Sequence, residues 1–180
     1  EWMEISELGN TLNTAGDDNG DNQDASQVVS LPFNFKFYGQ TYDQITVSSN
    51  GWVSFGVTAL ESFRNDYLPG PGGPSPMIAA FWDDLYLQNN GGSDIYVYHD
   101  QTLNVFIIQW DNLQTYEDGS DETFQVILFN PQFYTTPTGD GDILLQYKEF
   151  NNTSNGGYVH GVPVHGGYCT VGIEDHTGLR

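Results

Sequence analysis

Positively charged residues are almost absent from this sequence. Its 180 residues include only 4 Lys and Arg against 24 Asp and Glu, which gives a formal net charge of -20. A surface with this charge repels the phosphate backbone of nucleic acids and the anionic headgroups of membranes. The composition therefore argues against nucleic-acid binding and against electrostatic binding to an anionic membrane.

Cysteine and long apolar runs are also scarce. Cys169 is the single cysteine, so an internal disulfide and a cysteine-based zinc site are excluded. It lies in an alternating apolar run, which favours a small buried hydrophobic residue over a reactive thiol. No apolar run approaches the roughly 20 residues that cross a bilayer, so we expect no membrane insertion.

Apolar residues are nevertheless plentiful enough to form a core. Hydrophobic residues make up 38% of the chain and aromatic residues 14%, which argues against intrinsic disorder. The length fits one domain.

Because the sequence begins at Glu1 rather than at Met, we expect a piece of a longer, secreted precursor. The excess of carboxylates causes charge repulsion, which either bound Ca²⁺ or screening by a salty medium would reduce.

Apolar and polar residues alternate with a period of two from about residue 28 onward, as in half-buried strands. Phe33, Phe35 and Phe37 fall on one face, and the Asn50-Gly51 dipeptide favours a tight hairpin turn. Apolar residues on both faces of 105–108 indicate a strand that is covered on each side. Further strands are predicted at residues 52–55, 95–99, 103–110, 123–129, 142–147 and 168–174.

These strands predict an all-β fold, an antiparallel, jelly-roll-like β-sandwich with little helix. One or two helical turns are expected at residues 59–65, followed by a rigid Pro-Gly loop at 69–74. Residues 1–27 are predicted to form an edge strand and an acidic, calcium-binding loop, or else a tether. Residues 28–180 form the sandwich of what is one domain overall.

Several ordered motifs resemble a known family. The motifs are LPFNFKFYG at 31–39, VSSNGWVSFG at 47–56, MIAAFWDDL at 77–85, ETFQVILF at 122–129, GDILLQY at 141–147 and TVGIE at 170–174. Their order resembles a β-sandwich module of secreted bacterial peptidases and surface proteins, and more distantly the extracellular domain of nidogen. The resemblance spans roughly residues 28 to 178. It implies a non-catalytic accessory or adhesion module, without a defined ligand.

The densest acidic tract lies near the N-terminus. Asp17, Asn19 and Asp21 are spaced so that a tight loop can turn their oxygens toward one Ca²⁺, with Asp24 close behind. Val28 stands where an EF-hand carries its bidentate Glu, so this is not an EF-hand. The alternative is a solvated acidic loop.

A second acidic cluster occupies residues 116–122, between two apolar strands. Its carboxylates repel one another unless a cation or solvent separates them, so Asp118 and Asp121 are candidate calcium ligands.

Two further pairs of aspartates are candidate ligands. Asp83 and Asp84 follow an apolar strand, so at least one is expected to be partly buried and to need a partner. Such a residue accepts loop N–H groups, binds calcium or acts as a catalytic acid. Asp140 and Asp142 are typical turn residues first and calcium ligands second.

Catalytic motifs are missing. The sequence has no Gly-x-Ser-x-Gly elbow and no His-Glu-x-x-His helix for zinc. Abundant carboxylates would permit glycoside hydrolysis, but abundance alone carries no specificity. We therefore expect no catalytic residues and no enzymatic activity in this domain.

Exposed tyrosines are the main candidates for ligand contact. Rings beside Asp and Asn suit both sugar stacking and protein interfaces, whereas ordinary packing on a sheet surface is the alternative. The tyrosines expected to be exposed are Tyr86, Tyr96, Tyr98, Tyr116, Tyr134 and Tyr158.

The Gly-rich insert at 156–167 does not belong to the resemblance, and long loops at the end of a rigid sandwich often bind ligands. Tyr158 is its candidate anchor, with His160 and His165 as polar partners and with Tyr116 and Tyr86 as further ligand-binding candidates. A functionless insertion is the alternative.

The sequence therefore predicts a calcium-stabilised, extracellular accessory module of a bacterial secreted or cell-surface protein. Its expected partners are a glycan or an extracellular protein surface, together with neighbouring domains of the same precursor. The alternative is a purely structural spacer beside a secreted peptidase.

Overall fold

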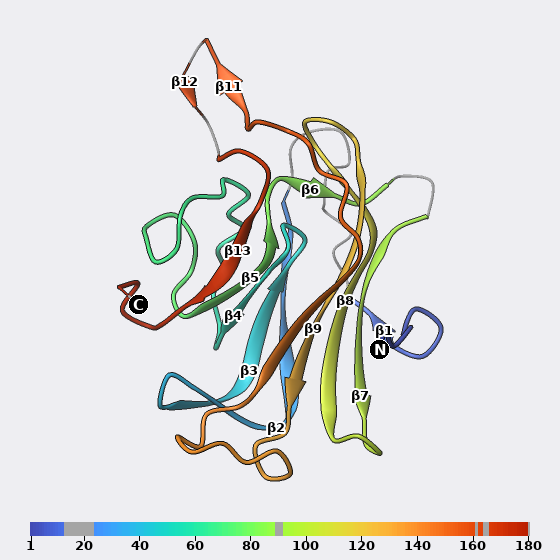
Figure 1. Cartoon of the computed structure of the whole chain (residues 1–180), viewed down its shortest axis with the longest axis vertical. Coiled ribbons are helices and arrows are strands. Elements are labelled where there is room, and N and C mark those ends of the chain that lie inside the picture. The colour runs from blue at the N-terminus through green and yellow to red at the C-terminus, as the bar shows by residue number, and fades with distance from the viewer. Residues whose placement is uncertain (13–23, 89–91, 161, 164–165, 180) are drawn as a thin grey trace.

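The computed structural model describes residues 1–12, 24–88, 92–160, 162–163 and 166–179. These residues form two antiparallel sheets that pack as a β-sandwich (Figure 1), which confirms the predicted fold class. None of the described residues is helical, so this part of the chain holds no helix that could cross a membrane. The helical turns predicted at 59–65 were therefore wrong.

The first sheet has the order β1-β7-β8-β9-β10, with β6 also paired to β8. Its strands are β1 (Asn10–Thr11), β6 (Leu85–Tyr86), β7 (Asp94–Asp100), β8 (Val105–Thr115), β9 (Asp121–Phe129) and β10 (Ile143–Glu149).

The second sheet has the order β13-β5-β4-β3-β2, and a separate short hairpin pairs β11 with β12. The strands of this sheet are β2 (Ser26–Phe37), β3 (Gln40–Ser48), β4 (Trp52–Phe55), β5 (Met77–Trp82) and β13 (Thr170–Glu174). The hairpin consists of β11 (Tyr158–Val159) and β12 (Val162–Pro163).

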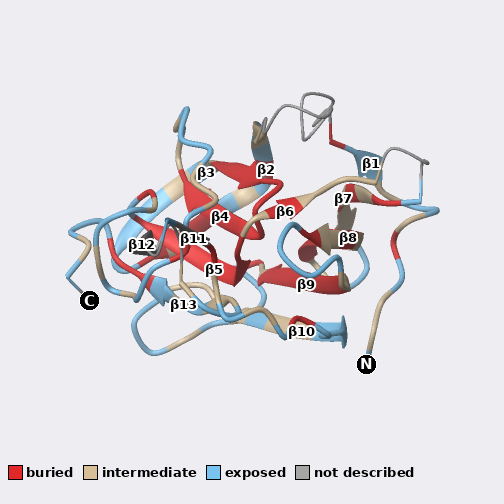
Figure 2. Ribbon diagram, turned by 90° about the horizontal axis from the view of Figure 1, so that it is seen from above, coloured by how far each residue is buried: buried red, intermediate tan, exposed pale blue. Residues whose placement is uncertain are grey.

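Aromatic side chains fill the space between the two sheets. Phe35 and Phe37 of β2 stack on Phe55 of β4, and Phe124 of β9 stacks between Phe81 and Trp110. The face of β2 that carries Phe35 and Phe37 is thus the core face, as predicted. Burial of these apolar side chains is the main contribution to the stability of the fold. Figure 2 shows the buried strands at the centre of the molecule.

The N-terminal segment covers the outer face of the first sheet. Ile5 is fully buried against Val105, Ile107 and Ile127. Its N–H donates to Oε1 of Gln109 at 3.3 Å. The prediction that residues 105–108 are covered on both faces is therefore confirmed.

The long connection between β4 and β5 covers the outer face of the second sheet. The indole N–H groups of Trp52 and Trp82 both donate to the carbonyl oxygen of Ser62, at 2.9 Å each. Leu68 packs on the same cluster. Trp82 is therefore buried on this outer face and not between the sheets.

Candidate functional site

One end of the sandwich is closed by a network of buried polar side chains, which begins at the turn between β3 and β4. Asn50 is buried in this turn. Its Oδ1 accepts the Leu85 N–H at 3.0 Å, and its Nδ2 donates to Asp24 at 2.8 Å. Next to it, Gly51 has a φ of 72° and its carbonyl accepts the Phe81 N–H at 3.0 Å. The turn thereby joins β4, β5 and β6.

Asp83 follows β5 at the same end and is buried, as expected of at least one member of the pair. Its carboxylate accepts the Asp84 N–H at 3.0 Å and the Nδ2 of Asn152 at 2.5 Å. Burial, followed by the negative charges of Glu117 and Asp118, raises the pKa of Asp83 to about 8 against the effect of these hydrogen bonds. Asp83 is therefore largely protonated at neutral pH.

The loop between β8 and β9 holds the second acidic cluster. The carboxylate of Asp118 accepts hydrogen bonds from the Thr115 hydroxyl, from Ser120 and from the N–H and hydroxyl of Thr153 at 2.9 Å. Burial alone would raise its pKa, but these donors lower it below the ordinary value. The donors of Asp118 thus tie this loop to the segment after β10.

Glu122, the second residue of β9, is the buried acid next to that loop. It accepts the Ser120 hydroxyl and the Asn151 N–H, both at 2.8 Å. Burial raises its pKa, and the hydrogen bonds oppose this effect only in part. Asp121 beside it accepts from Gln88 at 3.0 Å and from Gln114 at 2.9 Å.

The predicted calcium ligands fall into two groups. Asp83, Asp118 and Asp121 accept the protein hydrogen bonds described above, and Asp24 accepts one from Asn50. Within the described ranges, no three His, Cys, Asp or Glu residues come together in a metal-binding arrangement. Asp17, Asn19 and Asp21 lie outside the described residues, so the N-terminal calcium site stays a prediction.

Two other aspartate positions serve local structure. The carbonyl of Asp84 accepts the Tyr116 N–H at 2.9 Å, which connects β6 to the acidic loop. At the opposite end of the sandwich, Oδ1 of Asp140 accepts the Gly39 N–H at 2.7 Å.

The candidate tyrosines differ in exposure. Tyr116 is exposed at the start of the acidic loop, whereas Tyr86 is half-buried and donates its hydroxyl to Gln114 at 2.7 Å. The tyrosines that pack partly buried on the outer face of the first sheet are Tyr96, Tyr98 and Tyr134. For these three residues, ordinary sheet packing is what the structure shows.

The insert after β10 contains the β11–β12 hairpin, which projects from this end of the sandwich (Figure 1). Its base is fixed, because the Tyr168 N–H donates to the Ser154 carbonyl at 2.8 Å and the Gly166 N–H to the Asn65 carbonyl at 2.9 Å. Tyr158 pairs with Pro163 across the hairpin, and His160 is exposed with a φ of 52°. His165 lies outside the described residues.

An open pocket that the sequence did not indicate lies at the opposite end, beside the first residues of β10. Its volume is about 200 Å³, and its lining is mostly apolar. The lining residues are Phe37, Tyr38, Asp140, Gly141, Ile143 and Ile173. They come from β2, β10 and β13 and the loops beside them, so no local motif could have revealed the pocket.

A family model described as NIDO related, that is nidogen-related, matches residues 2–178 of this chain. The match includes the N-terminal segment and the insert, which the resemblance in the sequence motifs left out. No solved structure matches the chain.

Proposed function

This chain belongs to the nidogen-related family, and we propose that it is a non-catalytic, extracellular binding module of a larger secreted or cell-surface protein. The observation that carries the proposal is the β11–β12 hairpin, which stands clear of the sandwich on a base fixed by hydrogen bonds. A rigid sheet that presents a protruding loop is a common arrangement for recognition. The resemblance to modules of secreted peptidases supports a peptidase as a neighbouring domain.

The proposed ligand is a glycan or a protein surface that contacts the hairpin and the adjacent acidic loop. Tyr116 provides an exposed ring at the start of that loop. Its position is held by its own N–H bond to Asp84 and by the bonds of Asp118 to Thr153. These bonds fix the backbone that carries the ring, so the loop loses little conformational entropy when a ligand binds.

We also propose that calcium stabilises the module through Asp17, Asn19, Asp21 and Asp24. The net charge of -20 supports this, because a divalent cation relieves the repulsion between neighbouring carboxylates.

The binding proposal is tested with arrays of glycans and of extracellular matrix proteins, probed with the isolated domain. We expect a reproducible hit that is lost when residues 157–165 are replaced by Asn-Gly and weakened by Tyr116→Ala. Tyr67→Ala is the matched control, since Tyr67 is equally an exposed tyrosine but belongs to the β4–β5 connection. The absence of any hit would favour the structural spacer, and a hit retained without the hairpin would overturn the proposed site.

A further inference from the structure

One lateral side of the sandwich is bounded by two edge strands. Among the described residues, β10 pairs only with β9 and β13 pairs only with β5. Figure 2 shows β10 and β13 along the same side of the molecule, one from each sheet. Each strand therefore has a row of backbone N–H and C=O groups without a strand partner, which is the condition for pairing with another chain.

The apolar side chains of β13 on this side are left uncovered. Glu174 accepts the Gly70 N–H at 2.9 Å, and Gly172 lies against Leu68, so both face the connection that covers the outer sheet surface. Because side chains alternate along a strand, Val171 and Ile173 point the other way, toward the interior. They are nevertheless 49% and 42% exposed. The second sheet thus extends beyond the part that the first sheet covers.

The facing wall of this gap is formed by β10. At one end, Ile143 and Ile173 line the same open pocket with Phe37 and Tyr38. At the other end, the Tyr147 hydroxyl donates to the Ala80 carbonyl of β5 at 2.6 Å.

Two further contacts set the limits of this gap. Tyr147 also contacts Phe150, with ring centroids 5.2 Å apart, and both rings are partly exposed. Burial, followed by the charge of Cys169, raises the pKa of Tyr147 to about 12, which is consistent with the start of β13 lying close by. The pocket at the Tyr38 end and the exposed apolar side chains of Val171 and Ile173 thus lie between the two edge strands, and together they are called the groove. Tyr147 closes the other end of the groove through its contact with Ala80.

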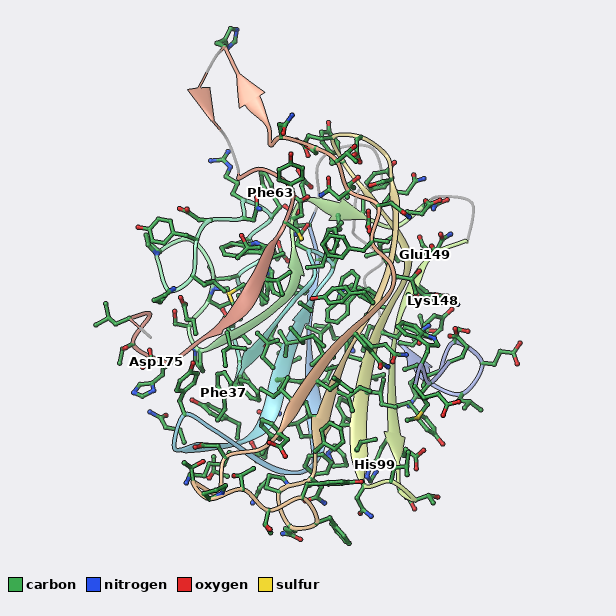
Figure 3. All side chains as sticks on the ribbon, in the orientation of Figure 1. Phe37, Phe63, His99, Lys148, Glu149 and Asp175 are labelled. Carbon is green, nitrogen blue, oxygen red and sulfur yellow. The ribbon has the colours of Figure 1, made fainter. Side chains whose placement is uncertain are left out.

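Acidic groups border the groove at both ends. Asp140 lines the pocket, and burial followed by the charge of Asp175 raises the pKa of Tyr38 beside it. Figure 3 shows Phe37 and Asp175 toward one end of the edge strands and Glu149 toward the other. Both nearby cations already have partners: Lys36 at one end donates to the Thr138 carbonyl at 2.7 Å, and Lys148 at the other end pairs with Glu4 at 3.1 Å.

This charge pattern selects among the possible occupants. A second copy of the chain would bring another 20 negative charges to an acidic rim and would be repelled. A partner that carries positive charge is attracted to the same rim.

We propose that this groove binds an extended, basic segment of a partner protein, which adds as a strand to the free edge of β13. Apolar side chains of the segment fill the gap over Val171 and Ile173, and its Lys or Arg residues face the acidic rim. The inference rests on the proposed role as a binding module but assigns a protein ligand and a second site, separate from the hairpin.

The test uses synthetic peptides and isothermal titration calorimetry at low salt with the full chain. The probe is acetyl-Lys-Ile-Thr-Val-Thr-Val-Lys-amide, with two controls: the same peptide with Glu in place of Lys, and one with Pro at the central Val. We expect the basic peptide to bind and both controls to fail. In an amide NMR spectrum, the basic peptide should shift the signals of Val171 and Ile173.

A pair of matched variants locates the site. Ile173→Lys should weaken binding by about tenfold or more, because it fills the groove and places a positive charge where the positively charged peptide binds. Val57→Lys makes the same charge change at a side chain that is 70% exposed on the β4–β5 connection, and should leave the affinity unchanged. Thermal melting of both variants checks that they fold.

Several results would overturn the inference: equal binding of the acidic peptide, equal loss in both variants, failure of all peptides to bind, or self-association of the free chain in sedimentation. Its failure is distinguishable from failure of the proposed hairpin site. The hairpin replacement should retain peptide binding, and Ile173→Lys should retain any array hit.

Discussion

Gly51 is the residue at which the fold leaves least room. A Cβ built there would lie 2.0 Å from the Phe81 carbonyl oxygen, and the backbone has a positive φ. We predict that Gly51→Ala lowers the free energy of unfolding by more than about 3 kcal/mol, because β4 and β5 must separate to admit the methyl group. Urea denaturation followed by tryptophan fluorescence measures this effect.

Gly39 provides the matched control for that substitution. It also has a positive φ, of 79°, but no atom lies within 4 Å of its would-be Cβ. Gly39→Ala should therefore lose only the conformational term of about 1 kcal/mol. Equal losses in the two variants would mean that backbone strain, and not the contact with Phe81, determines the effect.

Asp83 predicts a pH dependence of stability. Its ordinary pKa is 3.8 in the unfolded chain, and burial raises it to about 8 in the folded protein. The folded state thus binds the extra proton, so its stabilising contribution is complete below pH 4 and is lost as the pH rises through 8. The loss from this group is at most about 1.4 kcal/mol per pH unit.

The window from pH 5 to 8 separates this effect from that of the carboxylates whose pKa is lowered. Carboxylates with a lowered pKa, such as Asp118 and Asp140, are ionised in both states there and contribute no slope. Asp83→Asn should flatten the decline in melting temperature over this window, measured with EDTA present. It should also lower stability at pH 5. The Asn side chain has one acceptor oxygen, so it cannot accept from both the Asp84 N–H and the Asn152 Nδ2 as Asp83 does. An unchanged slope would assign the pH dependence to other buried acids such as Glu122.

The sequence predicted individual residues where the cause is local. The burial of an Asp after Phe81-Trp82 follows from the apolar strand before it, and the Asn50-Gly51 turn follows from its dipeptide. The partners could not be predicted, because Thr153 reaches Asp118 across 35 positions and Asn152 reaches Asp83 across 69. Such contacts depend on how the sheets pack and not on any spacing in the chain.

At the scale of elements, the N-terminal segment is the clearest case of an irregular stretch that stabilises a sheet. Ile5 is fully buried on the outer face of the first sheet. Ile5→Ala should lower the free energy of unfolding by about 2 to 4 kcal/mol, because it removes buried methyl groups and leaves a cavity.

Leu8 in the same segment is 61% exposed, and Leu8→Ala should change stability by less than about 0.5 kcal/mol. Chemical denaturation of both variants tests the assignment. A small effect at both positions would show that the segment is dispensable.

Strands were predicted well because alternation is a local signal, as the match of 123–129 to β9 (Asp121–Phe129) shows. The β4–β5 connection was predicted poorly for the opposite reason. Its path is set by Trp52 and Trp82, whose indole N–H groups hold the Ser62 carbonyl, and this constraint overrides the weak helical tendency of residues 59–65. The open groove between β10 and β13 likewise depends on how far one sheet extends past the other.

At the scale of the whole molecule, acidity is the dominant feature. The described part of the chain has one salt bridge, between Lys148 and Glu4 at 3.1 Å, so hydrogen bonds satisfy most of the buried carboxylates described above. Folding still brings 24 acidic groups together against 4 basic ones. The mean repulsion must be offset by screening or by bound cations.

We therefore predict that millimolar Ca²⁺ raises the melting temperature by several degrees relative to EDTA. Ligand binding to the native state alone contributes about 2.7 kcal/mol at a hundredfold excess over the dissociation constant. Sodium chloride at matched ionic strength is the control, because general screening requires no specific ligands. If sodium chloride reproduces the whole increase, screening is the correct account and the site at Asp17 to Asp24 does not exist. If the increase is specific to calcium, replacing Asp17 and Asp21 by Asn should abolish it, whereas Asp142→Asn should not.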